Sequence, residues 1–158
     1  MFDRPPSAPG GLVEPDAVDS GPFVPKAIVG TPRPAPPVAA GARRSDVVYE
    51  LHVRGFTGRH PEVSEAQRGT VTALAHPAVI AHLAALGVGI VELMPLAAWI
   101  DERHLARLGL HNYWGYNPVA MLAPDPRLAP GGMAEVAESV AALKAAGFEV
   151  ILDVVLNH

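Results

Sequence analysis

The sequence contains no cysteine and no concentration of charge of one sign. Without cysteine, the 158-residue chain forms neither disulfides nor cysteine-ligated metal sites. This composition fits a reducing compartment, and many exported proteins share it. The 12 basic residues are scattered, with no run longer than Arg43-Arg44, and the formal net charge is −4. A nucleic-acid partner is not expected, because contact with phosphates requires a basic patch.

Long apolar runs are also missing, and no secretory leader is expected. No segment approaches the roughly 18 apolar residues of a membrane span, so no membrane partner is expected. The first residues, Met1-Phe-Asp-Arg, lack the basic start and apolar stretch of a secretory signal. The sequence therefore predicts a cytoplasmic protein.

Proline is concentrated in the first part of the chain. Most of the 17 prolines precede residue 42, and residues 31–37 are Thr-Pro-Arg-Pro-Ala-Pro-Pro. Because proline fixes φ and removes a backbone donor, residues 1–44 are expected to form a Pro-rich linker. Apolar residues make up 49% of the chain and charged residues 18%, which indicates a globular chain. We expect the globular domain to comprise residues 45–158.

From Ser45 onward, the apolar pattern predicts the order strand, helix, strand, helix, strand. The strands are expected at residues 47–53, 88–94 and 148–156, and the helices at 77–86 and 132–146. Met133 is expected to begin the buried stripe of the second helix. Near-continuous apolar strands joined by helices indicate an α/β fold with a parallel sheet. Long strand-to-helix connections favour an incomplete (β/α)8 TIM barrel with strands 1–3 only, and a doubly wound sheet also fits the order.

The most unusual segment is Asn-Tyr-Trp-Gly-Tyr-Asn-Pro at residues 112–118. Aromatic rings stack on the apolar faces of sugars, and asparagine bonds their hydroxyl groups. The same residues also suit a loop held by buried aromatic side chains. The histidines show no metal-ligand spacing, and no Gly-rich phosphate loop follows any strand, so no metal or cofactor is expected.

Several polar residues fall on or just after the expected strands. Asp153 is expected in the middle of the third strand, where a buried carboxylate needs a partner, and none is evident in the sequence. Asn157 and His158 would lie at the C-terminal end of that strand, in a structural or a functional role. Glu50 and Glu92 could join Asp153 as an acid/base cluster. Mid-strand positions lie below the barrel mouth, which argues against that use.

Taken together, these segments resemble glycoside hydrolase family 13, in its glycogen-debranching and isoamylase branch. The resemblance covers roughly residues 20–158. Residues 153–158, Asp-Val-Val-Leu-Asn-His, are similar to the first conserved region of the family, on strand three. Residues 48–57 resemble the strand-one motif, residues 92–95 the end of strand two, and residues 112–118 the loop that follows. Residues 21–27 resemble the segment that links the N-terminal β-sandwich of this branch to its barrel.

The resemblance implies roles for four residues. Tyr116 matches a tyrosine that stacks on the sugar just before the scissile bond, and His158 matches a histidine that hydrogen-bonds the same sugar. Asn157 matches a calcium-binding position of many α-amylases that is usually structural in debranching enzymes. Asp153 matches an aspartate that pairs with an arginine near strand four. The implied partner is an α-glucan such as glycogen or limit dextrin.

The catalytic Asp, Glu and Asp of that family follow strands four, five and seven. We therefore expect an N-terminal fragment of a hydrolase of α-1,6 branch linkages, with no catalytic residue of its own and no activity alone. One alternative is a non-catalytic glucan-binding or partner-assembled module that uses Tyr113, Trp114 and Tyr116. Another is a different family activity, such as isoamylase. Low stability is also expected, since strands one and three would have unpaired edges.

Overall fold

The computed structural model describes residues 19, 21–23, 29–30 and 46–156. The chain divides into two units, residues 1–38 and 39–158, and each is described by itself. The described part of the first unit contains one 3-10 helix, η1 (Gly21–Phe23), whose first amide donates to the Asp19 carboxylate at 2.8 Å. Most of the expected linker over residues 1–44 lies outside the described residues, as do Asn157 and His158.

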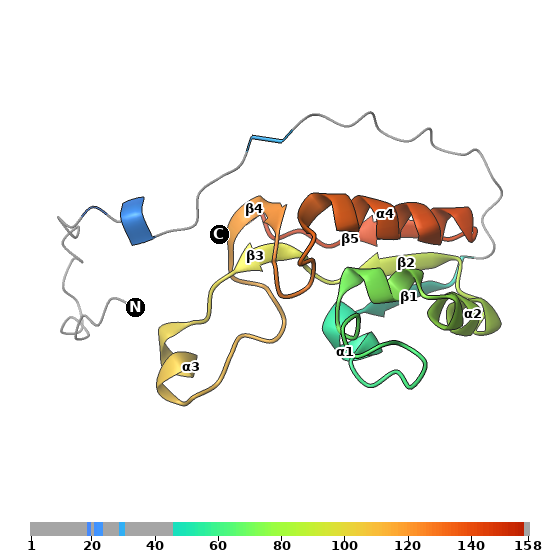
Figure 1. Cartoon of the computed structure of the whole chain (residues 1–158), viewed down its shortest axis with the longest axis horizontal. Coiled ribbons are helices and arrows are strands. Elements are labelled where there is room, and N and C mark those ends of the chain that lie inside the picture. Colours follow the sequence, from blue (N-terminus) through green and yellow to red (C-terminus); the bar gives the residue numbers. More distant parts are fainter. Residues whose placement is uncertain (1–18, 20, 24–28, 31–45, 157–158) are drawn as a thin grey trace. The chain divides into compact units, whose positions relative to one another are not determined.

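A parallel three-stranded sheet forms the centre of the second unit (Figure 1). Its strands are β1 (Val48–Leu51), β2 (Ile90–Leu93) and β5 (Glu149–Leu152). They pair in the order β1-β2-β5, so β1 and β5 are the outer strands of this sheet within the described residues. The predicted α/β fold is confirmed.

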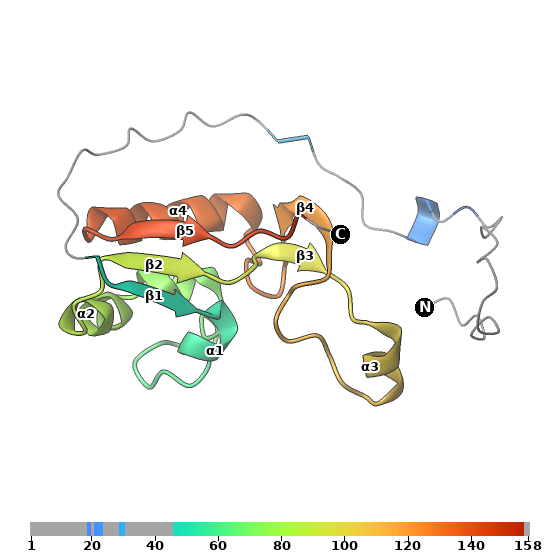
Figure 2. The same cartoon turned by 180° about the vertical axis from the view of Figure 1, so that it is seen from behind.

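The two longer α-helices directly precede the strands β2 and β5 and contribute buried faces to the core. Helix α2 (Pro77–Ala85) begins with proline at its first turn, and His76 caps it by accepting a hydrogen bond from the amide of residue 78. Helix α4 (Gly132–Ala145) packs against β4, β5 and the 3-10 helix η2 (Val71–Ala75), and Figure 2 shows it behind β5. The placement of Met133 in the buried stripe is wrong, because 54% of it is exposed. No helix in the described ranges is long and apolar enough to cross a membrane.

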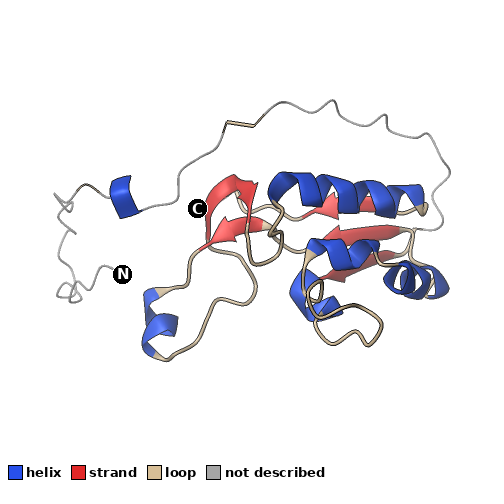
Figure 3. Ribbon diagram, in the orientation of Figure 1, coloured by secondary structure: helices blue, strands red, loops and turns tan. Residues whose placement is uncertain are grey.

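The two long connections contain regular structure that the apolar pattern did not predict (Figure 3). The first holds α1 (Val53–Thr57) and η2. The second holds β3 (Ala97–Trp99), α3 (Arg103–Arg107) and β4 (Pro118–Pro124), and β3 pairs with β4 in an antiparallel hairpin. Figure 2 shows this hairpin beyond the C-terminal ends of the three parallel strands.

All three predicted strands are shorter than expected, and the first and third end early at residues that matter for the site. The first ends at Leu51, because His52 turns away to cap α1 and accepts a hydrogen bond from the Gly55 amide. The third ends at Leu152, so the placement of Asp153 in the middle of a strand is wrong. Its amide still donates to the Leu93 carbonyl at 2.9 Å, which holds Asp153 at the C-terminal edge of the sheet.

The core is formed by one continuous cluster of apolar side chains from the sheet, η2, α2, α4 and the hairpin. Burial of such a cluster is the main favourable term in folding. Its largest members with almost no exposed surface are Val53, Val63, Val71, Leu74, Val79, Leu83, Val88, Val91, Leu93, Leu128 and Leu143.

Candidate functional site

The candidate site is built around the aromatic loop, residues 112–117, which connects α3 to β4. Tyr113, Trp114 and Tyr116 are 44%, 54% and 38% exposed, so the loop presents three ring systems at the surface. Large aromatic side chains are mostly buried in folded proteins. A group of exposed rings therefore indicates a binding surface.

Asn112 holds the aromatic loop in place through all four of its polar groups. Its amide donates to Asp101 at 2.8 Å, and its carbonyl accepts from the Trp99 indole at 3.0 Å. Its side-chain nitrogen donates to Glu102 at 2.9 Å, while its side-chain oxygen accepts from the Gly115 amide at 2.9 Å. The exposed rings therefore stand on a loop whose base is fully hydrogen-bonded.

Gly115 allows the loop to turn tightly against the hairpin. Its φ is +82°, a backbone conformation that residues other than glycine rarely adopt, and the residue is buried. A Cβ at this position would lie 3.3 Å from the Trp99 ring and 3.4 Å from the Pro95 carbonyl oxygen. The site thus needs glycine for both its backbone angle and its close approach.

Beneath the loop, an arginine joins the Trp99 ring to a buried carboxylate. The Arg127 guanidinium lies 3.9 Å from the centre of the Trp99 ring and donates twice to Asp125, at 2.8 and 2.7 Å. Burial of Asp125 opposes its ionisation. Hydrogen bonds from Arg127 and from the Trp99 amide nevertheless hold the pKa of Asp125 below its usual value. This ion pair fixes the hairpin that carries the loop.

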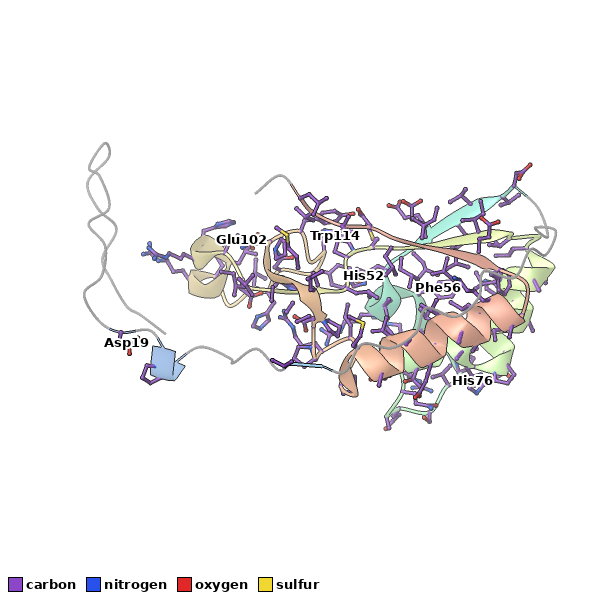
Figure 4. The ribbon with its side chains drawn as sticks, turned by 90° about the horizontal axis from the view of Figure 1, so that it is seen from above. Asp19, His52, Phe56, His76, Glu102 and Trp114 are labelled. Carbon is purple, nitrogen blue, oxygen red and sulfur yellow. The ribbon has the colours of Figure 1, made fainter. Side chains whose placement is uncertain are left out.

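His52 connects the end of β1 to the aromatic loop. Its ring stacks on Tyr113 with centroids 4.2 Å apart, and the Trp114 ring meets it edge-on at 5.9 Å. Figure 4 labels His52 and Trp114 near one another. The Nε2 atom lies 2.7 Å from the Tyr113 carbonyl oxygen, and Nδ1 accepts from the Gly55 amide at 3.0 Å. Burial lowers the pKa of His52, so the neutral ring is favoured. Since Nδ1 is an acceptor, Nε2 carries the proton.

Tyr116 bonds to Asp153 across the C-terminal edge of the sheet. Its hydroxyl donates to the Asp153 carboxylate at 2.5 Å. This hydrogen bond, with burial and the charges of Asp153, Glu50 and Glu92, raises the pKa of Tyr116 to about 12. The expectation that Asp153 has no partner in this chain is therefore wrong. Tyrosine supplies the bond because the aromatic loop folds back over the edge of the sheet.

Glu50 and Glu92 lie side by side on the face of the sheet that also carries Ile151. The three positions are in register on β1, β2 and β5, and residues in register on parallel strands share a face. Glu50 and Ile151 are exposed, and Glu92 is half-buried. The negative charges of both glutamates, like that of Asp153, raise the pKa of Tyr116. The carboxylates of Glu50, Glu92 and Asp153 therefore all lie in the neighbourhood of the Tyr116 hydroxyl.

Three cavities border the aromatic loop. A cavity of about 380 Å³ is lined by residues that include His52, Arg54, Trp99 and Arg127, and one of about 240 Å³ lies beside Tyr49 and Phe56. The third, of about 440 Å³, is lined by Glu102, His104, Leu105, His111, Asn112, Tyr113, Trp114 and Tyr116. No group of three histidine or acidic side chains in the described residues is placed to hold a metal ion.

The sequence identified the aromatic loop and Asp153, and it missed the residues that support them. His52, Asp101, Glu102, Asp125 and Arg127 carried no signal as single residues. The Asp-Pro-Arg spacing at residues 125–127 was the available clue, because Asp in a turn often bonds the backbone two residues later, as Asp125 does here at 2.8 Å.

Sequence comparisons relate the chain to a part of larger enzymes. No family model matches it. Glycogen debranching enzymes of Klebsiella pneumoniae (strain 342) and Yersinia pseudotuberculosis serotype IB (strain PB1/+) are 46% identical to it over 160 and 162 residues. Both alignments cover 94% of this chain and 24% of the relative. The chain therefore spans about a quarter of the length of these relatives.

Solved structures give a consistent picture. A pullulanase from Anoxybacillus sp. LM18-11, complexed with maltotetraose, is 30% identical with a TM-score of 0.62, over 81% of this chain and 21% of that one. Pullulanase type I from Bacillus subtilis str. 168, complexed with maltose, is 28% identical with a TM-score of 0.63, over 82% and 20%. The resemblance to the debranching branch of glycoside hydrolase family 13 is confirmed.

Proposed function

Proceeding from this homology with glycogen debranching enzymes, we propose that the chain forms part of the α-glucan-binding wall of a debranching glycoside hydrolase. The parent enzyme would hydrolyse α-1,6 branch linkages in glycogen or limit dextrin. This chain would be an incomplete (β/α)8 barrel that supplies only the first three strands, β1, β2 and β5. The observation that carries the proposal is the aromatic loop held over the C-terminal edge of a parallel sheet, where Tyr116 bonds Asp153 at 2.5 Å. Active sites of such barrels lie at that edge.

Within this proposal, Tyr116 stacks on a glucose ring and His158 bonds the same sugar. Asp153 orients the Tyr116 phenol, and Asn157 supports the same edge. The half-exposed Tyr116 ring and the neighbouring Trp114 favour this role, because exposed rings bind the apolar faces of sugars.

Hydrolysis by these 158 residues alone is not part of the proposal. A retaining glycosidase needs two carboxyl groups about 5–5.5 Å apart, one as nucleophile and one as acid/base. In the family resembled here, the nucleophile follows strand four, the acid/base follows strand five, and a third carboxylate follows strand seven. Glu50 and Glu92 are neighbouring carboxylates, and their positions within β1 and β2, below the C-terminal edge, argue against their use in catalysis.

The second candidate is a non-catalytic glucan-binding module, favoured by the exposure of all three rings of the loop. An isoamylase with another glucan preference is a third. Both candidates use the same binding surface. The module would take part in no reaction, and the isoamylase would act on a different glucan.

Affinity electrophoresis in glycogen gels, with an assay for released reducing ends, tests the proposal. We expect the unsubstituted chain to be retarded without hydrolysis and Tyr116→Ala to lose this retardation. The control Leu122→Ala, which truncates a 92% exposed side chain on β4, should be retarded like the unsubstituted chain. Absence of retardation in the unsubstituted chain would refute glucan binding. Hydrolysis that disappears in Glu50→Gln/Glu92→Gln would assign catalysis to the carboxylates of the sheet face.

A further inference from the structure

Glu102 has one carboxylate oxygen without a hydrogen-bond partner. Its Oε1 accepts from Asn112 at 2.9 Å, whereas its Oε2 is buried and meets no donor in the described part of the chain. Buried polar atoms in folded proteins nearly always have a partner, so this oxygen calls for a donor beyond the described residues.

The same residue lines the cavity of about 440 Å³ behind the aromatic loop. That volume falls in the range of roughly 300–1,000 Å³ typical of small-molecule sites. Tyr113, Trp114, His104 and His111 are also among its lining residues. The cavity thus joins ring faces, imidazoles and a carboxylate in one place.

We propose that this cavity is a second saccharide subsite, in which Glu102 accepts a hydrogen bond from a hydroxyl group of a glucose residue while the neighbouring rings contact the sugar. A carboxylate only accepts hydrogen bonds, and a hydroxyl donor forms a short, charge-assisted bond with it. Because Oε2 is buried, the proposal requires the soft side-chain torsion next to the carboxylate to rotate until Oε2 faces the cavity while Oε1 keeps its bond to Asn112.

A neutral sugar suits the cavity better than a cation. A bound cation would need several acidic or imidazole ligands together, and the described residues hold no group of three that could serve. The cavity is continuous with the proposed glucan site, because Tyr116 also lines it. The inference therefore rests on the proposed function and names where a longer glucan continues past Tyr116.

Calorimetric titration of the full chain with maltose and maltotetraose tests this subsite. Glu102→Gln keeps an oxygen for Asn112 and replaces Oε2 by a donor. We expect it to weaken maltotetraose binding about tenfold, which is about 1.4 kcal/mol, and to leave maltose binding unchanged. Glu138→Gln, on the exposed face of α4, is the matched control.

Leu105→Trp is the second variant, because it reduces the volume of the cavity while Glu102 itself is unchanged, and it should also weaken maltotetraose binding selectively. Unchanged thermal melting curves show that both variants are folded. Equal maltotetraose affinity in Glu102→Gln and the unsubstituted chain would overturn the subsite and leave water as the hydrogen-bond donor to Oε2. Loss of binding in Tyr116→Ala would still support the proposed function in that case. Binding of neither sugar by the unsubstituted chain would refute both.

Discussion

Arg127→Ala should destabilise the chain by removing the partner of a buried carboxylate. The Asp125 side chain is 3% exposed and that of Arg127 is 35% exposed. The substitution removes two side-chain bonds to Asp125, one bond to the Trp99 carbonyl and the guanidinium over the Trp99 ring. Asp125 keeps two backbone donors, the amides of residues 127 and 99.

The size of the effect follows from what remains. Removing one partner of a fully buried pair costs about 3–5 kcal/mol. Here the two backbone amides still solvate the carboxylate, and the guanidinium is partly open to water, which screens the pair. We therefore expect a loss of about 2–3 kcal/mol, a large share of a domain stability of about 5–15 kcal/mol.

Urea unfolding at neutral pH measures this loss, with Arg107→Ala, an exposed arginine of α3, as the control. The pH dependence is a second test. The folded pKa of Asp125 lies below its unfolded value, so its contribution is present above about pH 4 and is lost as pH falls through the folded pKa. Without the guanidinium, burial raises that pKa, and the difference between variant and unsubstituted chain should shrink on acidification. A loss under about 0.5 kcal/mol, the level of ordinary surface changes, would refute the argument.

Three further substitutions test the loop. Asn112→Ala removes its side-chain bonds to Glu102 and Gly115 and should cost about 2 kcal/mol in urea unfolding, at about 1 kcal/mol per bond; an unchanged midpoint would contradict the role of Asn112. Gly115→Ala should cost at least about 1–2 kcal/mol, since alanine disfavours positive φ, whereas Gly30→Ala, where an added Cβ meets nothing within 4 Å, is a neutral control. Ultraviolet titration should show a phenol ionising near pH 12 that is absent in Tyr116→Phe. Asp153→Asn should move that ionisation toward about pH 10, and because the folded pKa of Tyr116 is raised, its bond contributes below about pH 10 and is lost as pH rises through about 12.

Strands and long helices could be predicted from apolar periodicity because burial imposes it. The pattern located β2 and α2 to within two or three residues, and Gly87, with φ of +76°, ends α2 as glycine should. The same pattern gave no sign of α1 or α3. Each has five residues, and helices this short depend on caps and tertiary contacts rather than on periodicity.

The aromatic loop could be predicted as a segment, but its contacts could not. Tyr116 and Asp153 are 37 positions apart, and only the three-dimensional fold brings them together. Asp101 shows the same limit. It bonds the Asn112 amide and pairs with His111 at 2.8 Å, and this pairing lowers its pKa. Composition and spacing carry no information about such pairs.

The imidazole of His52 makes the junction between α1 and the aromatic loop insensitive to small changes of pH near neutrality. Protonation of Nδ1 would place a second hydrogen against the Gly55 amide and remove the helix cap, and burial already disfavours the charged ring. Protonation, when acid overcomes that lowered pKa, would therefore remove the cap while Nε2 still donates to the Tyr113 carbonyl. One neutral imidazole thus ties the start of α1 to a loop 61 positions further along the chain.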